Sequence, residues 1–272
     1  MSSSLDIGVV YTHEREMMPH LLETMAASGQ GLYPRLILID NNSAEGVEPW
    51  CKYFPETRIV RNLRRMPYAA NLNRILKASS ARYVLLMNTD MYFDPREQCL
   101  TKMVEFMDRR PECGIAGCRL FHADGSDAYA ARRFQTLPLV LARRTGLGRW
   151  MQNTVKHHFY GEHAPNETWP CDWLSGCFLI VRRQAIEQVG LFDEEYGKYF
   201  EDVDMCLRMA QANWQVMYHG AVSCVHLEQR ASRRLLSSDA WTHLAAYARW
   251  LRKWGPHPSA MPSTAMPSRR AA

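Results

Sequence analysis

The sequence has no long hydrophobic run, no paired cysteine motif and no long basic stretch in its first 225 residues. No window approaches the roughly 20 consecutive apolar residues that span a bilayer, so no transmembrane helix is expected. The chain begins without the basic and apolar regions of a secretory signal, which favours a cytoplasmic location. None of the eight cysteines forms a Cys-x-x-Cys pair, so we expect free thiols in the core.

The charge balance is only mildly basic. The chain has 33 Lys and Arg residues against 28 Asp and Glu residues, which gives a net charge of +5. This balance suits an anionic small ligand or a membrane surface, and it predicts no nucleic-acid partner. The hydrophobic fraction of 47% over 272 residues is typical of a globular protein, with one large domain and appendages.

Short apolar runs alternate with helix-length segments through the first 120 residues. This pattern predicts an α/β fold with a mostly parallel central sheet flanked by helices. A nicotinamide-dependent oxidoreductase would share the pattern, but the first strand lacks a glycine-rich turn after it. The expected strands are 7–11, 36–39, 58–60, 83–87 and 114–116, and the expected helices are 14–28, 69–80 and 95–109.

The second half predicts fewer regular elements. Asp124-Gly125 is typical of a hairpin turn, and residues 134–170 are expected to form a long, partly mobile excursion. A strand over 177–181, a short helix ending near 189–190 and a helix over 201–212 follow. Asn213 suits the left-handed residue that ends this helix. Two closing strands are expected, over 214–218 and 221–225.

Three acidic sites carry the chemistry. Asp40 and Asp90 each end an apolar run, where a parallel sheet binds its ligands, although Asp40 alone could simply form an Asx turn or a helix cap. Glu201-Asp-Val-Asp204 opens a helix after the aromatic loop 196–200, and a capping role is the plainer interpretation of Glu201.

Together these sites could supply one carboxylate for a nucleotide, one for a divalent cation and one for a proton. This division suits the displacement of a nucleoside diphosphate from a sugar. A hard cation can neutralise the departing diphosphate, and an ionised Asp can take the proton of the attacking hydroxyl.

Five ordered blocks resemble family 2 glycosyltransferases, and most closely their bacterial rhamnosyltransferase-like branch. The resemblance covers about residues 5–227. The blocks are Ile39-Asp-Asn-Asn-Ser43, Pro67-Tyr-Ala-Ala-Asn-Leu-Asn73, Met87-Asn-Thr-Asp90, Trp173-Leu-Ser-Gly-Cys177 and Phe192-Asp-Glu followed by Tyr199-Phe-Glu-Asp-Val-Asp-Met-Cys-Leu-Arg208, then Trp214 and His226.

The resemblance implies an inverting transferase of the nucleotide-diphospho-sugar fold, called GT-A. It implies that Asp40 reads the nucleotide base and that Asp202 is the general base. It also implies that Asp90, with His226 nearby, binds Mg²⁺ or Mn²⁺. Without that family likeness, a retaining mechanism would stay open, although no second carboxylate is placed as a nucleophile.

The remaining implied residues divide between the two substrates. Those assigned to the nucleotide-diphospho-sugar donor are Thr12, Asn42, Asn71, Asn73 and Asn88, with Asp40 and Asp90; those assigned to the acceptor are Trp173, Gly176 and Glu201. The acceptor would be a hydroxyl of a glycan, a lipid-linked or a small molecule, and the sugar rhamnose or another hexose. A catalytically inactive nucleotide-sugar-binding or scaffold protein of the same fold is the alternative.

The chain departs from the family pattern at two positions. Pro67 stands where the family usually has Gly, so the backbone of the donor loop is stiffer here. The metal motif reads Asn-Thr-Asp90, with one carboxylate, which predicts weak metal affinity in the absence of donor.

The C-terminal region predicts a separate helix. We expect a transferase domain over 1–229, an amphipathic helical segment over 230–255 and a disordered tail over 256–272. The segment combines six basic residues with Trp241, Trp250 and Trp254. Such a helix could lie on an anionic membrane surface or pack back on the domain.

Overall fold

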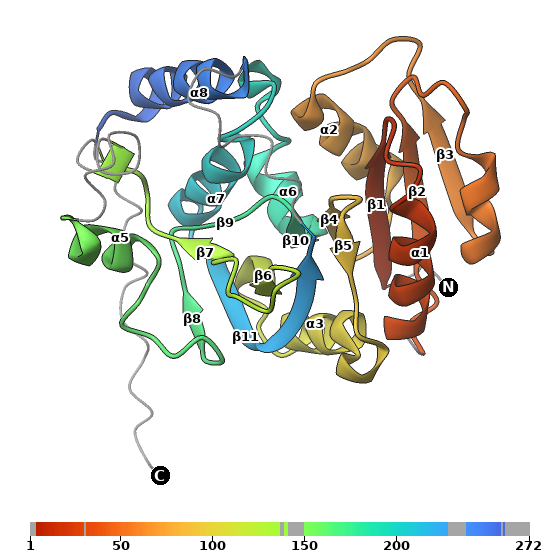
Figure 1. Ribbon diagram of the computed structural model, residues 1–272, viewed down its shortest axis with the longest axis horizontal. Coiled ribbons are helices and arrows are strands. Elements are labelled where there is room, and N and C mark those ends of the chain that lie inside the picture. Colours follow the sequence, from red (N-terminus) through yellow and green to blue (C-terminus); the bar gives the residue numbers. More distant parts are fainter. Residues whose placement is uncertain are drawn as a thin grey trace.

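The computed structural model describes residues 4–29, 31–136, 139–140, 150–227, 238–256 and 258. In these ranges one mixed sheet crosses the molecule, with strand order β3-β2-β1-β4-β10-β6-β11-β5 and with β8 paired to β11. Figure 1 shows helices α1 and α3 on one side of the sheet and α2, α6 and α7 on the other. This arrangement confirms the predicted fold class.

The first half of the sheet is wholly parallel. Its strands are β1 (Leu5–Tyr11), β2 (Arg35–Asp40), β3 (Thr57–Arg61) and β4 (Tyr83–Met87). All but β3 are almost continuously buried because helices cover both faces. The carboxyl ends of β1, β2 and β4 therefore meet at one edge.

The helices in this half begin and end close to the predicted positions. Helix α1 (Met18–Ser28) begins later than expected, with Pro19 in its first turn, where proline is tolerated. Helix α2 (Tyr68–Ala78) begins directly after Pro67. The expected helix 95–109 is interrupted at Gln98, which adopts a left-handed conformation between the 3₁₀ turn η2 (Pro95–Glu97) and α3 (Cys99–Asp108). A further turn, η1 (Glu48–Tyr53), was not predicted.

The second half brings antiparallel pairs into the sheet. Strand β10 (Phe178–Arg182) runs antiparallel to both of its neighbours, β4 and β6 (Cys113–Phe121). The two expected closing strands are one bulged strand, β11 (Gln215–His226), parallel to β6. Strand β5 (Met91–Tyr92) pairs with the end of β11.

The long excursion contains more structure than the sequence predicted. Helix α5 (Gln152–His158) and strand β8 (Thr168–Pro170) lie within it, whereas residues 137–138 and 141–149 lie outside the described part. Strand β7 (Ala131–Arg132) pairs with β9 (Trp173–Leu174) as a separate ribbon. At the predicted hairpin, Gly125 adopts a φ of +80°, but an isolated bridge between Phe121 and Asp127 stands in place of paired strands.

The last elements carry the acidic cluster. Helix α6 (Arg183–Val189) and the turn η4 (Glu194–Tyr196) lead to α7 (Glu201–Gln211). Asn213 follows with a φ of 64°, as predicted. The eight cysteines are free, and all except Cys51 are buried.

Helix α8 (Ser238–Trp254) packs back on the domain above α7 (Figure 1). The side chain of Trp250 is fully buried and contacts Phe134 and Phe200. The indole N–H of Trp254 donates to Asp204 Oδ1 at 2.8 Å. No helix in the described ranges is both long and apolar enough to cross a membrane.

Parts of the predicted C-terminal organisation lie outside the described residues. These parts include Arg230, Arg233 and Arg234 and nearly all of the tail 256–272.

Candidate active site

The carboxyl ends of β1 and β4 open into a cavity of about 390 Å³, called here the strand-end cavity. This edge of a parallel sheet is the usual ligand-binding edge of an α/β fold. Its lining is largely polar and comes from both strand ends, from α2 and from the aromatic loop. The lining residues are Val10, Thr12, His13, Glu14, Met17, Asn41, Met66, Tyr68, Asn71, Asn88, Thr89, Asp90 and Lys198.

A second cavity, of about 630 Å³, contains the start of α7 and is called here the carboxylate cavity. Its lining includes Gly176, Glu201, Asp202 and His226. The two cavities adjoin, because Tyr68, Asn88 and Lys198 line both. The geometry therefore brings four of the seven predicted donor residues, Thr12, Asn71, Asn88 and Asp90, next to two of the predicted acceptor residues, Gly176 and Glu201.

Tyr68 lies on the boundary between the cavities, a position that the sequence analysis did not predict. Its hydroxyl donates to Asn88 Oδ1 at 2.9 Å, and its backbone N–H donates to Gly197 O at 3.0 Å. Burial raises the pKa of Tyr68 well above 10, with further contributions from Glu201 and other acids nearby. The hydroxyl therefore stays protonated and acts as a donor at neutral pH.

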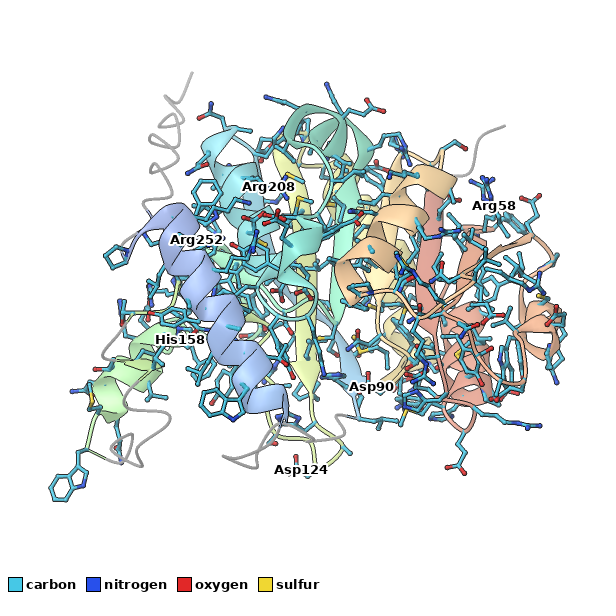
Figure 2. All side chains as sticks on the ribbon, turned by 90° about the horizontal axis from the view of Figure 1, so that it is seen from above. Arg58, Asp90, Asp124, His158, Arg208 and Arg252 are labelled. Atoms are coloured by element: carbon cyan, nitrogen blue, oxygen red, sulfur yellow. The ribbon has the colours of Figure 1, made fainter. Side chains whose placement is uncertain are left out.

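Asp90 and His226 meet where β11 pairs with β5. His226 Nε2 lies 3.2 Å from Asp90 Oδ2, and Leu227 N donates to the backbone oxygen of Asp90 at 2.8 Å. Asp90 Oδ1 is buried with no hydrogen-bond partner in the described chain. Figure 2 shows Asp90 between the N-terminal strands and the beginning of α8.

These two side chains fit a divalent cation, because an unpartnered buried carboxylate oxygen needs a positive partner. Within the described ranges no three His, Cys, Asp or Glu side chains form a complete metal-binding cluster. Donor phosphate oxygens and water would therefore have to complete the coordination. This fit agrees with the weak affinity that one carboxylate predicts.

Asp202 is held by backbone donors at the start of α7. Gly176 N donates to Oδ2 and Val203 N donates to Oδ1, each at 2.8 Å. Burial raises the pKa of Asp202 above 3.8, while these N–H groups act in the opposite direction. A Cβ at Gly176 would lie 3.2 Å from Asp202 Oδ2, so a larger residue would push this carboxylate by a few tenths of an ångström.

Glu201 does not cap the helix, which corrects the simpler expectation. The residue before α7 is Phe200, in a left-handed conformation with a φ of 68°, and it makes no side-chain capping bond. In the first turn, Asp202 and not Glu201 accepts from a backbone N–H, that of Val203. Glu201 lines the carboxylate cavity with Oε2 buried and unpartnered among the described residues. Burial and the neighbouring Asp202 raise the pKa of Glu201 to about 8, so its carboxyl is mostly protonated at neutral pH.

Asp204, the third acid of the cluster, lies away from the cavity and is structural. It is fully buried, accepts from Arg208 Nε at 2.8 Å and contacts Lys253 Nζ at 2.8 Å. Of the three acids, only Glu201 and Asp202 therefore line the carboxylate cavity.

Of Asp40, Asn41 and Asn42, the residue that lines the strand-end cavity is not one of the two that were expected there. Asp40 Oδ1 accepts from Ser43 N at 2.8 Å, which is an Asx turn, and Asp40 does not line the strand-end cavity. Asn42 is exposed, with a φ of 57°. Asn41 lines the cavity, and its Oδ1 accepts from Met66 N and from Asn62 Nδ2 at 2.8 Å. Sequence reasoning missed Asn41.

The remaining predicted residues take different places. Thr12 and Asn71 line the strand-end cavity, whereas Asn73 is bound to the backbone of Phe192 on both its amide atoms at 2.9 Å. Trp173 is buried outside the carboxylate cavity, and its indole N–H donates to Arg133 O at 2.9 Å. Asn73 and Trp173 therefore bind the backbone of neighbouring segments and do not line either cavity.

A sheet whose strand ends form a polar cavity beside a buried carboxylate fits a transferase of the GT-A fold. The family model described as Glycosyl transferase family 2 matches residues 6–190. The chain therefore belongs to glycosyl transferase family 2 and is a glycosyltransferase.

Curated relatives support the rhamnosyltransferase-like branch. An N-acetylglucosaminyl-diphospho-decaprenol L-rhamnosyltransferase of Mycobacterium tuberculosis is 28% identical over 78% of this chain and 71% of its own length. The rhamnosyltransferase WbbL of Escherichia coli is 24% identical over 62% of this chain and 61% of its own length. The O-antigen biosynthesis protein RfbC of Myxococcus xanthus is 30% identical over 86% of this chain, which covers 18% of that protein.

Solved structures share the fold. A mannosyltransferase of Pyrobaculum calidifontis in complex with GDP-Man and Mn²⁺ aligns with a TM-score of 0.63 and 17% identity, over 93% of this chain and 65% of the other. TarS of S. aureus in complex with UDP aligns with a TM-score of 0.57 and 14% identity, over 83% of this chain and 60% of the other.

Proposed function

We propose that this glycosyltransferase moves rhamnose or another hexose from a nucleotide-diphospho-sugar to an acceptor hydroxyl, with inversion at the anomeric carbon. The observation that carries the proposal is the placement of Asp90 and Asp202 in two adjoining cavities that share Tyr68 and Asn88. One cavity suits the nucleotide diphosphate and the other the acceptor. The names of the rhamnosyltransferase relatives favour rhamnose.

The donor would lie across the strand-end cavity. Thr12, Asn41 and Asn71 offer hydroxyl and amide groups to the nucleoside, and Asp90 with His226 would hold Mg²⁺ or Mn²⁺ beside the diphosphate. When bound, the ion would supply positive charge for the leaving diphosphate. The mannosyltransferase structure described above contains Mn²⁺, which supports the choice of ion.

Asp202 would act as the general base. The acceptor oxygen forms a bond to the anomeric carbon while the bond from that carbon to the diphosphate oxygen breaks, and the hydroxyl proton moves to Asp202. Tyr68 would hold Asn88 at the boundary where the sugar lies. The protonated Glu201 carboxyl would donate a hydrogen bond to the acceptor without adding a second negative charge beside Asp202.

The acceptor is proposed to be a glycan, with a lipid-linked sugar favoured over a small molecule because the mycobacterial relative is named for a diphospho-decaprenol acceptor. A cytoplasmic enzyme held at the inner face of a membrane would reach such an acceptor. The exposed face of α8, which includes Trp241 and Arg252, is the proposed contact with that surface.

A donor screen tests the proposal. The full chain is incubated with dTDP-, UDP- and GDP-sugars, with Mg²⁺, with Mn²⁺ and with EDTA, and release of nucleoside diphosphate is measured, with water taking the place of the acceptor hydroxyl. We expect one donor to be turned over, and only with the cation. An inactive nucleotide-sugar-binding protein would instead bind a donor with no release above the Asp202→Asn control.

A further inference from the structure

A third cavity, of about 590 Å³, opens on the far side of the β7–β9 ribbon and is called here the aromatic cavity. Helix α5, the segment before β7, β8 and β11 form its walls. In Figure 2, His158 on α5 lies on the opposite side of α8 from Asp90. The lining is dominated by Tyr129, Val155, Phe159, Tyr160, Trp169 and Tyr218.

Three polar side chains in this lining already make hydrogen bonds within the protein. The hydroxyl of Tyr160 donates to Asp172 at 3.2 Å, and that of Tyr218 donates to Pro165 O at 2.8 Å. Asp127 accepts from Arg119 Nε at 3.0 Å. The indole N–H of Trp169 is buried without a partner among the described residues.

A sugar ligand needs a polar partner for nearly every hydroxyl, and this lining offers few. Its rings and the methyl groups of Val155 instead suit an apolar chain. The ring of Tyr129, half exposed at 48%, lies 4.5 Å from the ring of Phe159, which leaves apolar surface open to solvent. An apolar occupant would cover that surface.

The β7–β9 ribbon lies between the aromatic cavity and the carboxylate cavity. Ala130 and Ala131 line the aromatic cavity, and Ala130 O accepts from Ser175 N at 2.9 Å. The next residue, Gly176, holds the carboxylate of Asp202. The proposed base and the aromatic cavity therefore lie on two sides of a thin wall of backbone.

Arg132 places a positive charge at this wall. Its guanidinium lies 4.9 Å from the ring centre of Trp173 and 5.9 Å from that of Phe159, and its Nε donates to Tyr129 O at 3.1 Å. Its charge reaches Asp202, where it favours the ionised carboxylate. Arg132 itself does not line the aromatic cavity, whereas the basic side chain of Lys156 does.

We propose that the aromatic cavity binds the apolar chain of a lipid-linked diphosphate acceptor, with Arg132 and Lys156 at the diphosphate and the sugar hydroxyl at Asp202. The order of the groups along the wall matches the order in such a molecule: a reacting sugar, two phosphates and an apolar chain. This assignment rests on the proposed function, because it names the acceptor class for the same carboxylate.

Calorimetric binding of farnesyl diphosphate to the full chain tests the assignment. EDTA and the absence of donor keep the probe out of metal-dependent nucleotide binding. We expect saturable binding that weakens about tenfold or more in Val155→Asp, because the variant places a charge in an apolar cavity. Arg132→Gln should weaken it by about as much. Asn153→Asp adds the same charge to α5 outside the lining and should bind as the wild type does.

Two further measurements separate the possible outcomes. Val155→Thr keeps the side-chain shape and should lose affinity by a few-fold, so the test remains valid if Val155→Asp does not fold. Equal affinity in wild type and the Val155 variants, or no saturable binding, would overturn the proposal. Preferential binding of a soluble oligosaccharide at Val155 would also overturn it, in favour of a glycan subsite.

This experiment is independent of transfer. A chain that binds farnesyl diphosphate at Val155 but releases no nucleoside diphosphate from any sugar donor would retain the chain-binding site and lose the proposed function. A chain that transfers sugar but does not bind farnesyl diphosphate would keep the proposed function and lose the chain-binding site.

Discussion

The hydroxyl of Tyr68 donates to Asn88 Oδ1 at 2.9 Å and so joins the strand-end cavity to the carboxylate cavity. Tyr68 begins α2 and Asn88 follows β4, so the hydrogen bond connects the start of this helix with the end of this strand at the ligand-binding edge. The boundary between donor and acceptor is therefore set by a side chain that contacts both cavities.

Tyr68→Phe tests this role. The change removes a hydroxyl from a partly buried position and leaves Asn88 Oδ1 without its donor, at a cost of about 1 kcal/mol. We expect kcat/KM for transfer to fall about tenfold, with kcat affected more than donor binding. Tyr83→Phe is the control, because the Tyr83 hydroxyl contacts Asp108 away from both cavities. It should lower thermal stability and leave kcat/KM unchanged.

Asp202→Asn tests the general base. The amide keeps the shape and removes the basicity, so transfer should fall about 10²-fold or more while calorimetric donor binding survives. Asp204→Asn should instead lower the melting temperature, because it weakens the contacts with Arg208 and Lys253. Near-normal turnover in Asp202→Asn would remove Asp202 from the mechanism.

Asp90→Ala tests the metal site. Nucleoside diphosphate affinity is measured with Mg²⁺, with Mn²⁺ and with EDTA, and the gain that the cation provides should disappear in this variant. Asp94→Ala is the matched control, because Asp94 pairs with Arg96 outside both cavities. An unchanged cation effect in Asp90→Ala would make Asp90 structural.

The protonation of Glu201 predicts a pH dependence of stability. Its pKa rises from 4.5 to about 8 on folding, so the folded chain binds more protons than the unfolded chain between these values. The contribution of Glu201 is therefore present below about pH 4.5 and is lost as the pH rises through 8. Glu201→Gln removes this loss.

Thermal melts from pH 5 to pH 8 measure the effect. The melting temperature of Glu201→Gln should improve relative to wild type as the pH increases, whereas Glu187→Gln, at an exposed position on α6, should follow wild type. Parallel curves for all three proteins would mean that Glu201 is ionised at neutral pH. The raised pKa of Asp202 also predicts that kcat/KM increases with pH as this base ionises.

The sequence predicted the first half of the sheet well because its strands are buried on both faces and read as continuous apolar runs. It did not predict that β10 runs antiparallel between β4 and β6, since hydrophobic pattern carries no information on strand order. The single strand β11 was read as two because polar and glycine residues at its bulge resemble a turn.

The sequence motifs indicated which residues belong to the site, but they did not indicate positions that depend on tertiary packing. Asp90 and His226 come together because β5 pairs with β11. Asn41 differs from Asp40 and Asn42 only in its direction at the strand end, which a run of three polar residues does not reveal. The position of Tyr68 depends on the aromatic loop, to which its backbone is bonded.

Because α8 packs on the domain, only its exposed side chains are available to contact a membrane. Trp250 is fully buried, and Lys253 and Arg249 pair with Asp193 and Glu195, so these groups stabilise the domain. Trp241 is 67% exposed, and Arg252 is exposed as well. Each basic residue near an anionic surface contributes about 1 kcal/mol, and an interfacial Trp adds apolar burial. The described part of α8 therefore predicts salt-sensitive binding to anionic vesicles.

Co-sedimentation with phosphatidylglycerol vesicles checks this expectation with point variants, because deleting α8 would expose the core around Trp250. Trp241→Ala combined with Arg252→Glu should lower the bound fraction several-fold at low salt. Trp150→Ala removes a tryptophan that is 81% exposed away from α8 and is the matched control. If the double variant partitions as the wild type does, α8 acts only as a packing element, and a lipid-linked acceptor would have to be reached through another surface.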